Sequence, residues 1–278
     1  MKHIVGFSGG IDSQAAARWV LNRYPAQDVI LLNSLAGRNE HPLTEEFIAW
    51  YSGNVHPVVQ VVPLVRDLYA KSETIEGKGL APDTELTFEL LARLKGRFPA
   101  RRSQFCTTYL KLEPSRRWID ENITDDYCRY VGVRRDESVA RHDVPEKEWD
   151  ELFDCMLYRP VVDWTKPQCF RFIKDHEGRW NELYDLGFTR VGCAPCVNSG
   201  KEDILRWAQR FPAMIDKVRG WEERTKRTFF PPTVPGKHIN WVDEVVSWAG
   251  TVHGGRQLGL HVLETRGTGC ENKWGFCE

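Results

Sequence analysis

The sequence predicts an α/β protein with a doubly wound, mostly parallel sheet and a helical C-terminal extension. In the first half, short apolar runs alternate with helical patterns at intervals of roughly 20 to 30 residues, which is typical of a parallel sheet with helices on both faces. Beyond Lys201 the apolar residues recur every three or four positions, which indicates helices alone. We therefore expect two units, 1–200 and 201–278.

The expected elements follow this alternation along the chain. Strands are expected at 4–7, 29–33, 58–62 and 127–133, and helices at 14–22, 44–51, 67–70 and 167–176. Residues 72–105 are rich in glycine and proline, which predicts an irregular excursion across the mouth of the site. In the extension, helices are expected over 204–218, interrupted at Pro212, and over 241–248.

The junction between the first strand and the first helix carries the strongest chemical signal. Residues 8–13 read S-G-G-I-D-S. Two adjacent glycines let the backbone turn sharply and present N–H groups to an anion, the serine hydroxyls add donors, and the positive end of the next helix faces the anion. The chain holds neither a Walker A string nor a dinucleotide fingerprint after a strand. The segment therefore favours a phosphate-binding loop over a plain serine–glycine turn.

Composition describes an ordinary soluble protein. The 278 residues are 41% hydrophobic and 28% charged, with a formal net charge of −1, which argues against coating nucleic acid through bulk charge. There is no 18-residue apolar stretch and no leader-like segment before the first strand, so we expect a cytoplasmic protein without a membrane partner. Segment 93–117 is locally basic and predicts either a solvated face or a contact with the DNA backbone.

The loop resembles the PP-loop of the ATP pyrophosphatases, S-G-G-x-D-S. Residues 132–141, G-V-R-R-D-E-S-V-A-R, resemble the G-x-R-R-x-x-S-x-x-R segment of the phosphoadenylyl-sulfate reductase group in the same superfamily. The resemblance covers about residues 1–200 and implies an adenine nucleotide alpha hydrolase-like fold that binds ATP with Mg²⁺. It implies nucleotide contacts from Ser8, Gly9, Gly10, Asp12, Ser13, Asn33, Lys111, Gly132, Arg134 and Arg141. Catalytic roles are expected for Ser8, Asp12, Ser13, Arg134 and Arg135.

The cysteines raise the question of a metal centre. The chain has eight cysteines, and without a secretory signal we expect them to be reduced. Residues 192–196 read G-C-A-P-C, and this C-x-x-C spacing lets the thiolates of Cys193 and Cys196 reach one metal. A structural zinc site and a redox pair without metal remain alternatives.

Residues 106–114 resemble the Cys-Cys-x-x-x-Lys-x-x-Pro segment of the iron–sulfur reductases, with Thr107 in place of the second cysteine. The resemblance implies a [4Fe–4S] cluster on Cys106, Cys193 and Cys196, with Cys270 as fourth ligand. The other candidates for that place are Cys155, Cys169, Cys277 or an iron left open to sulfide. Cys128 lies in an expected strand and is assigned to the core.

Three functions follow from the resemblance. The chain looks most like the DNA phosphorothioation ATP pyrophosphatases (DndC/SspD type), which implies adenylation of a DNA phosphate oxygen and sulfur from a cysteine desulfurase partner. Thiolation of a tRNA base is the nearest related reaction. Sulfonucleotide reduction is the second function, although the Glu-Cys-Gly-x-His motif of the reductases is absent. The third is a non-enzymatic nucleotide and cluster sensor.

Overall fold

A six-stranded sheet in the order β3-β2-β1-β4-β6-β5 forms the centre of the molecule. The computed structural model describes residues 1–69, 79–231 and 239–252. The strands are β1 (Lys2–Gly6), β2 (Val29–Ser34), β3 (Val58–Val61), β4 (Tyr127–Tyr130), β5 (Lys147–Asp150) and β6 (Cys155–Tyr158). All neighbouring strands run parallel except β5, which is antiparallel to β6. The expected doubly wound, mostly parallel sheet is confirmed.

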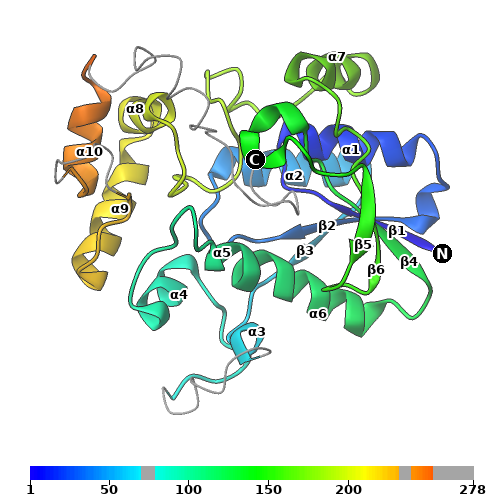
Figure 1. Ribbon diagram of the computed structural model, residues 1–278, viewed down its shortest axis with the longest axis horizontal. Helices are drawn as coiled ribbons and strands as arrows, with labels where there is room; N and C mark the ends of the chain where they lie inside the picture. Colours follow the sequence, from blue (N-terminus) through cyan, green and yellow to red (C-terminus); the bar gives the residue numbers. More distant parts are fainter. Residues whose placement is uncertain (70–78, 232–238, 253–278) are drawn as a thin grey trace.

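Helices cover both faces of this sheet (Figure 1). Those of the first part are α1 (Ile11–Leu21), α2 (Pro42–Asn54), α3 (Arg66–Tyr69), α4 (Phe88–Lys95), α5 (Phe105–Thr107), α6 (Glu113–Asn122) and α7 (Lys166–His176). The extension holds α8 (Lys201–Arg210), α9 (Pro212–Thr225) and α10 (Val242–Ala249). Figure 1 shows α1, α2 and α7 on one face, α6 on the other, and α8, α9 and α10 grouped beside the sheet. The expected helical extension, with its break at Pro212, is confirmed.

The strand order places the first loop at the centre of the sheet. From β1 the chain proceeds outward through β2 and β3, and then returns to the other side of β1 with β4. The direction in which the chain adds strands therefore reverses between β1 and β4. Ligands of such sheets bind at the carboxyl ends of the two strands at this switch point. Residues 8–13 follow β1 and residues 131–141 follow β4, so both sequence motifs lie at this switch point.

The β5–β6 hairpin is absent from the sequence-based expectations, and the inward positions of β5 are charged. In β5, Asp150 is buried and pairs with Arg129 of β4, and Glu148 pairs with the fully buried Arg159. A strand with carboxylates on its inner face has no apolar alternation to reveal it. The helix α4 within the expected irregular excursion 72–105 was also missed, and β4 ends at Tyr130 instead of Val133.

The largest hydrophobic cluster contains residues from both sides of position 200. It joins Phe88 and Leu91 of α4 with Trp207, Val218 and Trp221 of the extension. Cys128 lies in a separate cluster between the sheet and helices α1 and α2, where it is 5% exposed, so its assignment to the core is confirmed. The boundary between units 1–200 and 201–278 stays a prediction.

We expect Thr87→Ala to destabilise α4 measurably. The Thr87 hydroxyl accepts the Leu90 N–H at 3.1 Å, and Gly96 ends the helix in a left-handed conformation with φ 68°. Loss of a threonine N-cap costs about 1 kcal/mol of unfolding free energy. Urea unfolding measures this loss, and Thr225→Ala, whose hydroxyl donates to Trp221 O within α9, serves as the control that leaves α4 unchanged. Equal protection of α4 amides from hydrogen exchange in wild type and Thr87→Ala would contradict the role of this cap.

Within the described ranges, no helix is both long enough and apolar enough to cross a membrane.

Candidate nucleotide-binding site

Hydrogen bonds within the loop 8–13 hold it in a tight turn. Gly9 has φ 79°, and a Cβ there would lie 3.2 Å from Thr44 of α2, so glycine is required by both conformation and space. The Ser13 hydroxyl donates to Gly10 O at 2.9 Å and accepts the Ser8 N–H at 3.2 Å. The Ser8 and Ser13 hydroxyls lie 3.1 Å apart, and Ser8 Oγ accepts the Gly10 N–H at 3.4 Å. Ser13 thus braces the turn in this structure.

The loop after β4 closes on the loop after β1. Gly132 approaches so closely that a Cβ would lie 2.4 Å from the Asp12 carbonyl carbon and oxygen and 2.5 Å from Ser13 N. Two residues later, Arg134 Nε lies 2.7 Å from Asp12 Oδ2, in an ion pair with both side chains less than one tenth exposed. Burial opposes the charge of Arg134, but Asp12 and Asp136 outweigh it and raise the pKa of the guanidinium. The two sequence motifs therefore meet, and the charged guanidinium of Arg134 is held by the carboxylates of Asp12 and Asp136.

Three side chains around the loop keep a buried oxygen without a hydrogen-bond partner among the described residues: Asp12 Oδ1, Gln14 Oε1 and Asn33 Oδ1. Asn33 of β2 donates its amide to Phe7 O at 2.8 Å, which leaves its oxygen available as an acceptor. A buried acceptor without a partner is costly unless a ligand satisfies it. Asp12 Oδ1 fits Mg²⁺, because this ion commonly takes one protein carboxylate together with phosphate oxygens.

The other two arginines of segment 132–141 have acidic partners. Arg135 pairs with Asp163 and donates to Val144 O at 2.9 Å. Arg141 is fully buried and pairs with Glu137 one helical turn earlier. Arg134, in contrast, forms an ion pair with Asp12 of the loop 8–13. The expected phosphate contacts of Arg135 and Arg141 stay predictions.

Tyr184 contacts the first turn of α1 from a distant part of the chain. Its hydroxyl accepts the N–H of Ile11 at 3.0 Å, in the first turn of α1, from 173 residues away. Asn181, in the same turn, donates to Thr44 Oγ1 of α2 at 3.1 Å. Segment 181–187, which precedes the cysteine pair, therefore contacts the start of both helices that follow the nucleotide loops. Only the short Leu-Tyr pattern before a glycine could have indicated it.

We expect Tyr184→Phe to lower the unfolding free energy by about 1 kcal/mol, because the Ile11 N–H at the helix start loses its acceptor while the ring remains. Nucleotide binding should supply an alternative acceptor, so the difference from wild type should shrink when the unfolding is repeated with saturating ATP. Tyr158→Phe is the matched control, since its ring keeps the stacking on Tyr130 at 5.3 Å. A loss of stability that is the same with and without ATP would contradict this role of the hydroxyl.

The cysteine loop 193–196 packs against the turn that follows β2. Ala194 N–H donates to Asn39 O at 2.8 Å, Asn39 Nδ2 donates to Pro195 O at 3.2 Å, and Glu40 pairs with Cys193 in an isolated antiparallel bridge. Cys193 and Cys196 are partly exposed. The cysteine loop and the turn after β2 are therefore joined directly.

Three charged residues lie near this contact: Glu40, Lys111 and Lys217. Lys111 lies in a π-helical turn, Thr108–Leu112, between α5 and α6, and it is 6% exposed. Burial raises the pKa of Glu40 to about 7, and the charges of Lys111 and Lys217 oppose the rise. Sequence reasoning selected Lys111 but missed Glu40 and Lys217, because neither belongs to a recognisable motif.

The expected cluster ligands do not form a metal site in this structure. Among the described residues there is no group of three or more His, Cys, Asp and Glu side chains placed to hold a metal ion, so Cys106, Cys193 and Cys196 do not form one. Cys155 and Cys169, considered as fourth ligands, are buried in two other hydrophobic clusters. Cys270 and Cys277 lie outside the described residues. The [4Fe–4S] cluster and zinc stay predictions.

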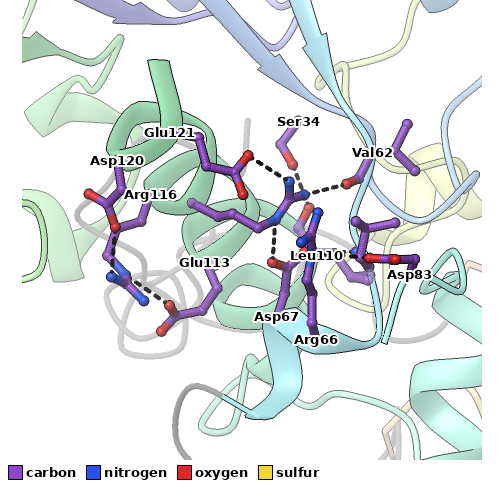
Figure 2. A network of polar contacts seen from close by, with 12 residues as sticks. Ser34, Val62, Arg66, Asp67, Asp83, Leu110, Glu113, Arg116, Asp120 and Glu121 are labelled. Atoms are coloured by element: carbon purple, nitrogen blue, oxygen red, sulfur yellow. Dashed lines mark hydrogen bonds and ion pairs between the residues drawn. The ribbon is translucent and has the colours of Figure 1, made fainter. Parts of the chain in front are cut away.

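The basic segment 93–117 does not form one continuous cationic face. Figure 2 shows its end, where Arg116 pairs with Glu113 at 3.1 Å and with Asp120 at 3.0 Å. Arg117 pairs with Asp67 at 2.7 Å and donates to Val62 O. Lys111 is buried, which leaves the earlier arginines as the exposed part: Arg93, Arg97 and Arg102. The expected contact with DNA stays a prediction, and its exposed candidates lie in the first half of the segment.

Comparison with known proteins places these observations in a family. Residues 2–199 match the family described as "Phosphoadenosine phosphosulfate reductase domain". An "Uncharacterized 37.8 kDa protein in gpa 5'region" of Escherichia phage 186 is 29% identical, and the alignment covers 99% of this chain and 96% of that protein. The adenosine 5'-phosphosulfate reductase of Allochromatium vinosum is 33% identical over 36% of this chain and 37% of the reductase. That of Neisseria meningitidis serogroup A is 33% identical over 41% and 48%. The chain thus matches less than half the length of either reductase.

Among solved structures, a phosphoadenylyl-sulfate reductase from Candida auris, in a phosphate complex, aligns with a TM-score of 0.47 and 17% identity over 69% of this chain and 81% of that chain. The sequence match to the family covers both loops of the switch point and the cysteine loop. This chain therefore belongs to the phosphoadenosine phosphosulfate reductase domain family.

Proposed function

We propose that this protein is an ATP pyrophosphatase that activates an acceptor oxygen for sulfur transfer, with a DNA backbone phosphate as the acceptor. Membership of the family supports binding of an adenine nucleotide and sulfur-related chemistry. The observation that carries the ATP assignment is the closure of the β4 loop on a complete S-G-G-x-D-S loop, with Arg134 2.7 Å from Asp12. Backbone amides at a helix start and a fixed guanidinium together suit a pyrophosphate group.

In the proposed reaction, the loop amides and Arg134 hold the β,γ-pyrophosphate of ATP. An oxygen of the DNA phosphate attacks the α-phosphorus, a new P–O bond forms to AMP, and pyrophosphate leaves with the electron pair. A sulfur nucleophile then attacks the DNA phosphorus and displaces AMP, which yields a phosphorothioate. Positive charge fixed near the leaving pyrophosphate stabilises the negative charge that develops on it. Mg²⁺, held by Asp12 Oδ1, would add to this neutralisation when bound.

The acceptor and the sulfur donor are inferred from the resemblance and from surface charge. Arg93, Arg97 and Arg102 are exposed in the first half of the basic segment and are available for phosphate contacts. The Glu40–Cys193 bridge supports delivery of sulfur next to the nucleotide, because it joins the cysteine loop to the turn after β2. A cysteine desulfurase is the proposed source of that sulfur: a thiol attacks the inner sulfur of its persulfide, a disulfide forms, and the outer sulfur leaves as the sulfide that attacks the DNA phosphorus.

The test is incubation of the protein with ATP, Mg²⁺, DNA, a cysteine desulfurase and cysteine, followed by nuclease digestion and mass spectrometry. Phosphorothioate dinucleotides are expected with wild type and should disappear with Asp12→Asn. Asp28→Asn is the matched control, since Asp28 pairs with Lys2 at the opposite end of the sheet. Sulfur recovered in tRNA bases alone would overturn the choice of DNA as acceptor.

Sulfonucleotide reduction is the second candidate, and the family description and the two reductase relatives favour it. It differs from the first proposal in its substrate, because the nucleotide then brings the sulfur and no pyrophosphate is released. Incubation with adenylyl sulfate or phosphoadenylyl sulfate and a thiol reductant distinguishes them. Release of sulfite without any change in DNA would replace the first proposal by this one.

A further inference from the structure

The helical extension contributes a side chain to the contact between the turn after β2 and the cysteine loop 193–196. Lys217 lies on α9, outside the residues 2–199 that match the family. Its Nζ donates to Arg38 O at 3.1 Å and to Asn39 Oδ1 at 3.3 Å. The ammonium also lies over the ring of Trp221, 5.0 Å from its centre. A residue from beyond the family match therefore contacts the turn after β2.

Asn39 transmits this contact to the cysteine loop. Its side chain is fully buried, with the oxygen accepting from Lys217 and the nitrogen donating to Pro195 O at 3.2 Å. Its backbone oxygen accepts the Ala194 N–H at 2.8 Å. Because the amide has one oxygen and one NH₂ group, the bond from Lys217 determines which of them faces the cysteine loop. Loss of the ammonium would leave the Asn39 amide free to flip and the loop less firmly held.

Charged groups surround the Lys217 ammonium from several elements. Burial lowers the pKa of Lys217, whereas the charges of Cys193, Glu45 and Glu40 favour its protonated form. Burial and the positive charge of the same ammonium lower the pKa of the His41 imidazole. Lys111 acts on Glu40 from the π-helical turn. The Glu40–Cys193 bridge thus lies near two ammonium groups, one from each part of the chain.

We propose that Lys217 is a positioning residue: it orients Asn39 and thereby holds the cysteine loop 193–196 against the turn after β2, which keeps Cys193 in place for sulfur transfer. This inference rests on the proposed sulfur transfer for its functional meaning. The positioning itself depends only on the contacts of Lys217 and Asn39. The extension is then a part of the proposed reaction site. Residues 2–199 alone supply Lys111 near the Glu40–Cys193 bridge but not Lys217.

The first test is hydrogen exchange of the nucleotide-free protein, followed at the Ala194 amide. Lys217→Met keeps the side-chain length and removes the donor, and we expect exchange at Ala194 to become about tenfold faster, a change equivalent to roughly 1.4 kcal/mol. Lys217→Arg should restore the wild-type rate, and Lys174→Met, an exposed lysine on α7, should leave it unchanged. An unchanged rate at Ala194 in Lys217→Met would overturn the proposal.

The second test separates positioning from nucleotide binding. Lys217→Met should lower kcat for sulfur transfer about tenfold and leave the KM for ATP within a factor of two, since the ATP loop has its own contacts. Equal sulfur transfer by wild type and Lys217→Met would remove the functional role. If exchange at Ala194 is faster in Lys217→Met but the wild-type protein transfers no sulfur, the proposed function fails while the positioning role of Lys217 stands.

Discussion

Gly132→Ala is expected to abolish nucleotide binding and to destabilise the protein by about 3 kcal/mol, the upper end of the cost of overpacking a fixed backbone. The added Cβ would lie 2.4 Å from the Asp12 carbonyl group and 2.5 Å from Ser13 N. These are backbone atoms in the first turn of α1, so no side chain can rotate away. The β4 loop must move outward, and Arg134 moves with it. Calorimetric titration with ATP and urea unfolding measure the two effects.

Gly53→Ala in α2 is the matched control. A Cβ at Gly53 meets nothing within 4 Å, and alanine favours the helix by about 0.5–1 kcal/mol over glycine. This variant should bind ATP as wild type does and be equally or slightly more stable. Wild-type ATP affinity in Gly132→Ala would show that the β4 loop takes no part in the nucleotide site.

Arg134→Met is expected to lower pyrophosphate release by at least about a hundredfold, which corresponds to roughly 2.7 kcal/mol of lost transition-state stabilisation. The variant removes the positive charge at the loop and leaves the buried carboxylate of Asp12 without its partner. Removal of one member of a buried ion pair costs about 3–5 kcal/mol in stability. Steady-state pyrophosphate release and urea unfolding measure both consequences.

A double-mutant cycle with Asp12→Asn tests the coupling. Because the two residues act through one ion pair, the double variant should be less destabilised than the sum of the two single variants. Arg206→Met combined with Asp12→Asn is the control. Arg206 pairs with Glu202 and Asp203 within α8, so the effects of these two variants should add. Strict additivity of the two single effects would contradict a direct contact between Arg134 and Asp12.

Local strings in the sequence identified the centre of the site, and contacts between distant residues completed it. The loop 8–13 and segment 132–141 carry their chemistry in consecutive residues, so both were visible before the structure. Tyr184 and Lys217 reach their partners from 173 and 178 residues away, and nothing in their local sequence indicates these contacts. Such partners are determined by how the helices pack, which periodicity does not specify.

Charge patterns were the least reliable guide. The run 93–117 resembles a single basic face, but burial of Lys111 and the acidic partners of Arg116 and Arg117 divide it. These partners include Asp67, which is 50 residues distant from Arg117. In β5, Asp150 lies among charged residues in the sequence yet is buried against Arg129. Sequence shows where charges are but not which of them are neutralised.

The most direct test of the central claim is the fate of ATP labelled at the α-phosphate, incubated with the wild-type protein, Mg²⁺, a sulfur donor and DNA. Cleavage between the α- and β-phosphates yields labelled AMP and unlabelled pyrophosphate in equal amounts, and this is the expected result. Labelled ADP, or ATP that stays intact while phosphorothioate forms, would contradict the assignment of the S-G-G-x-D-S loop to the departing pyrophosphate.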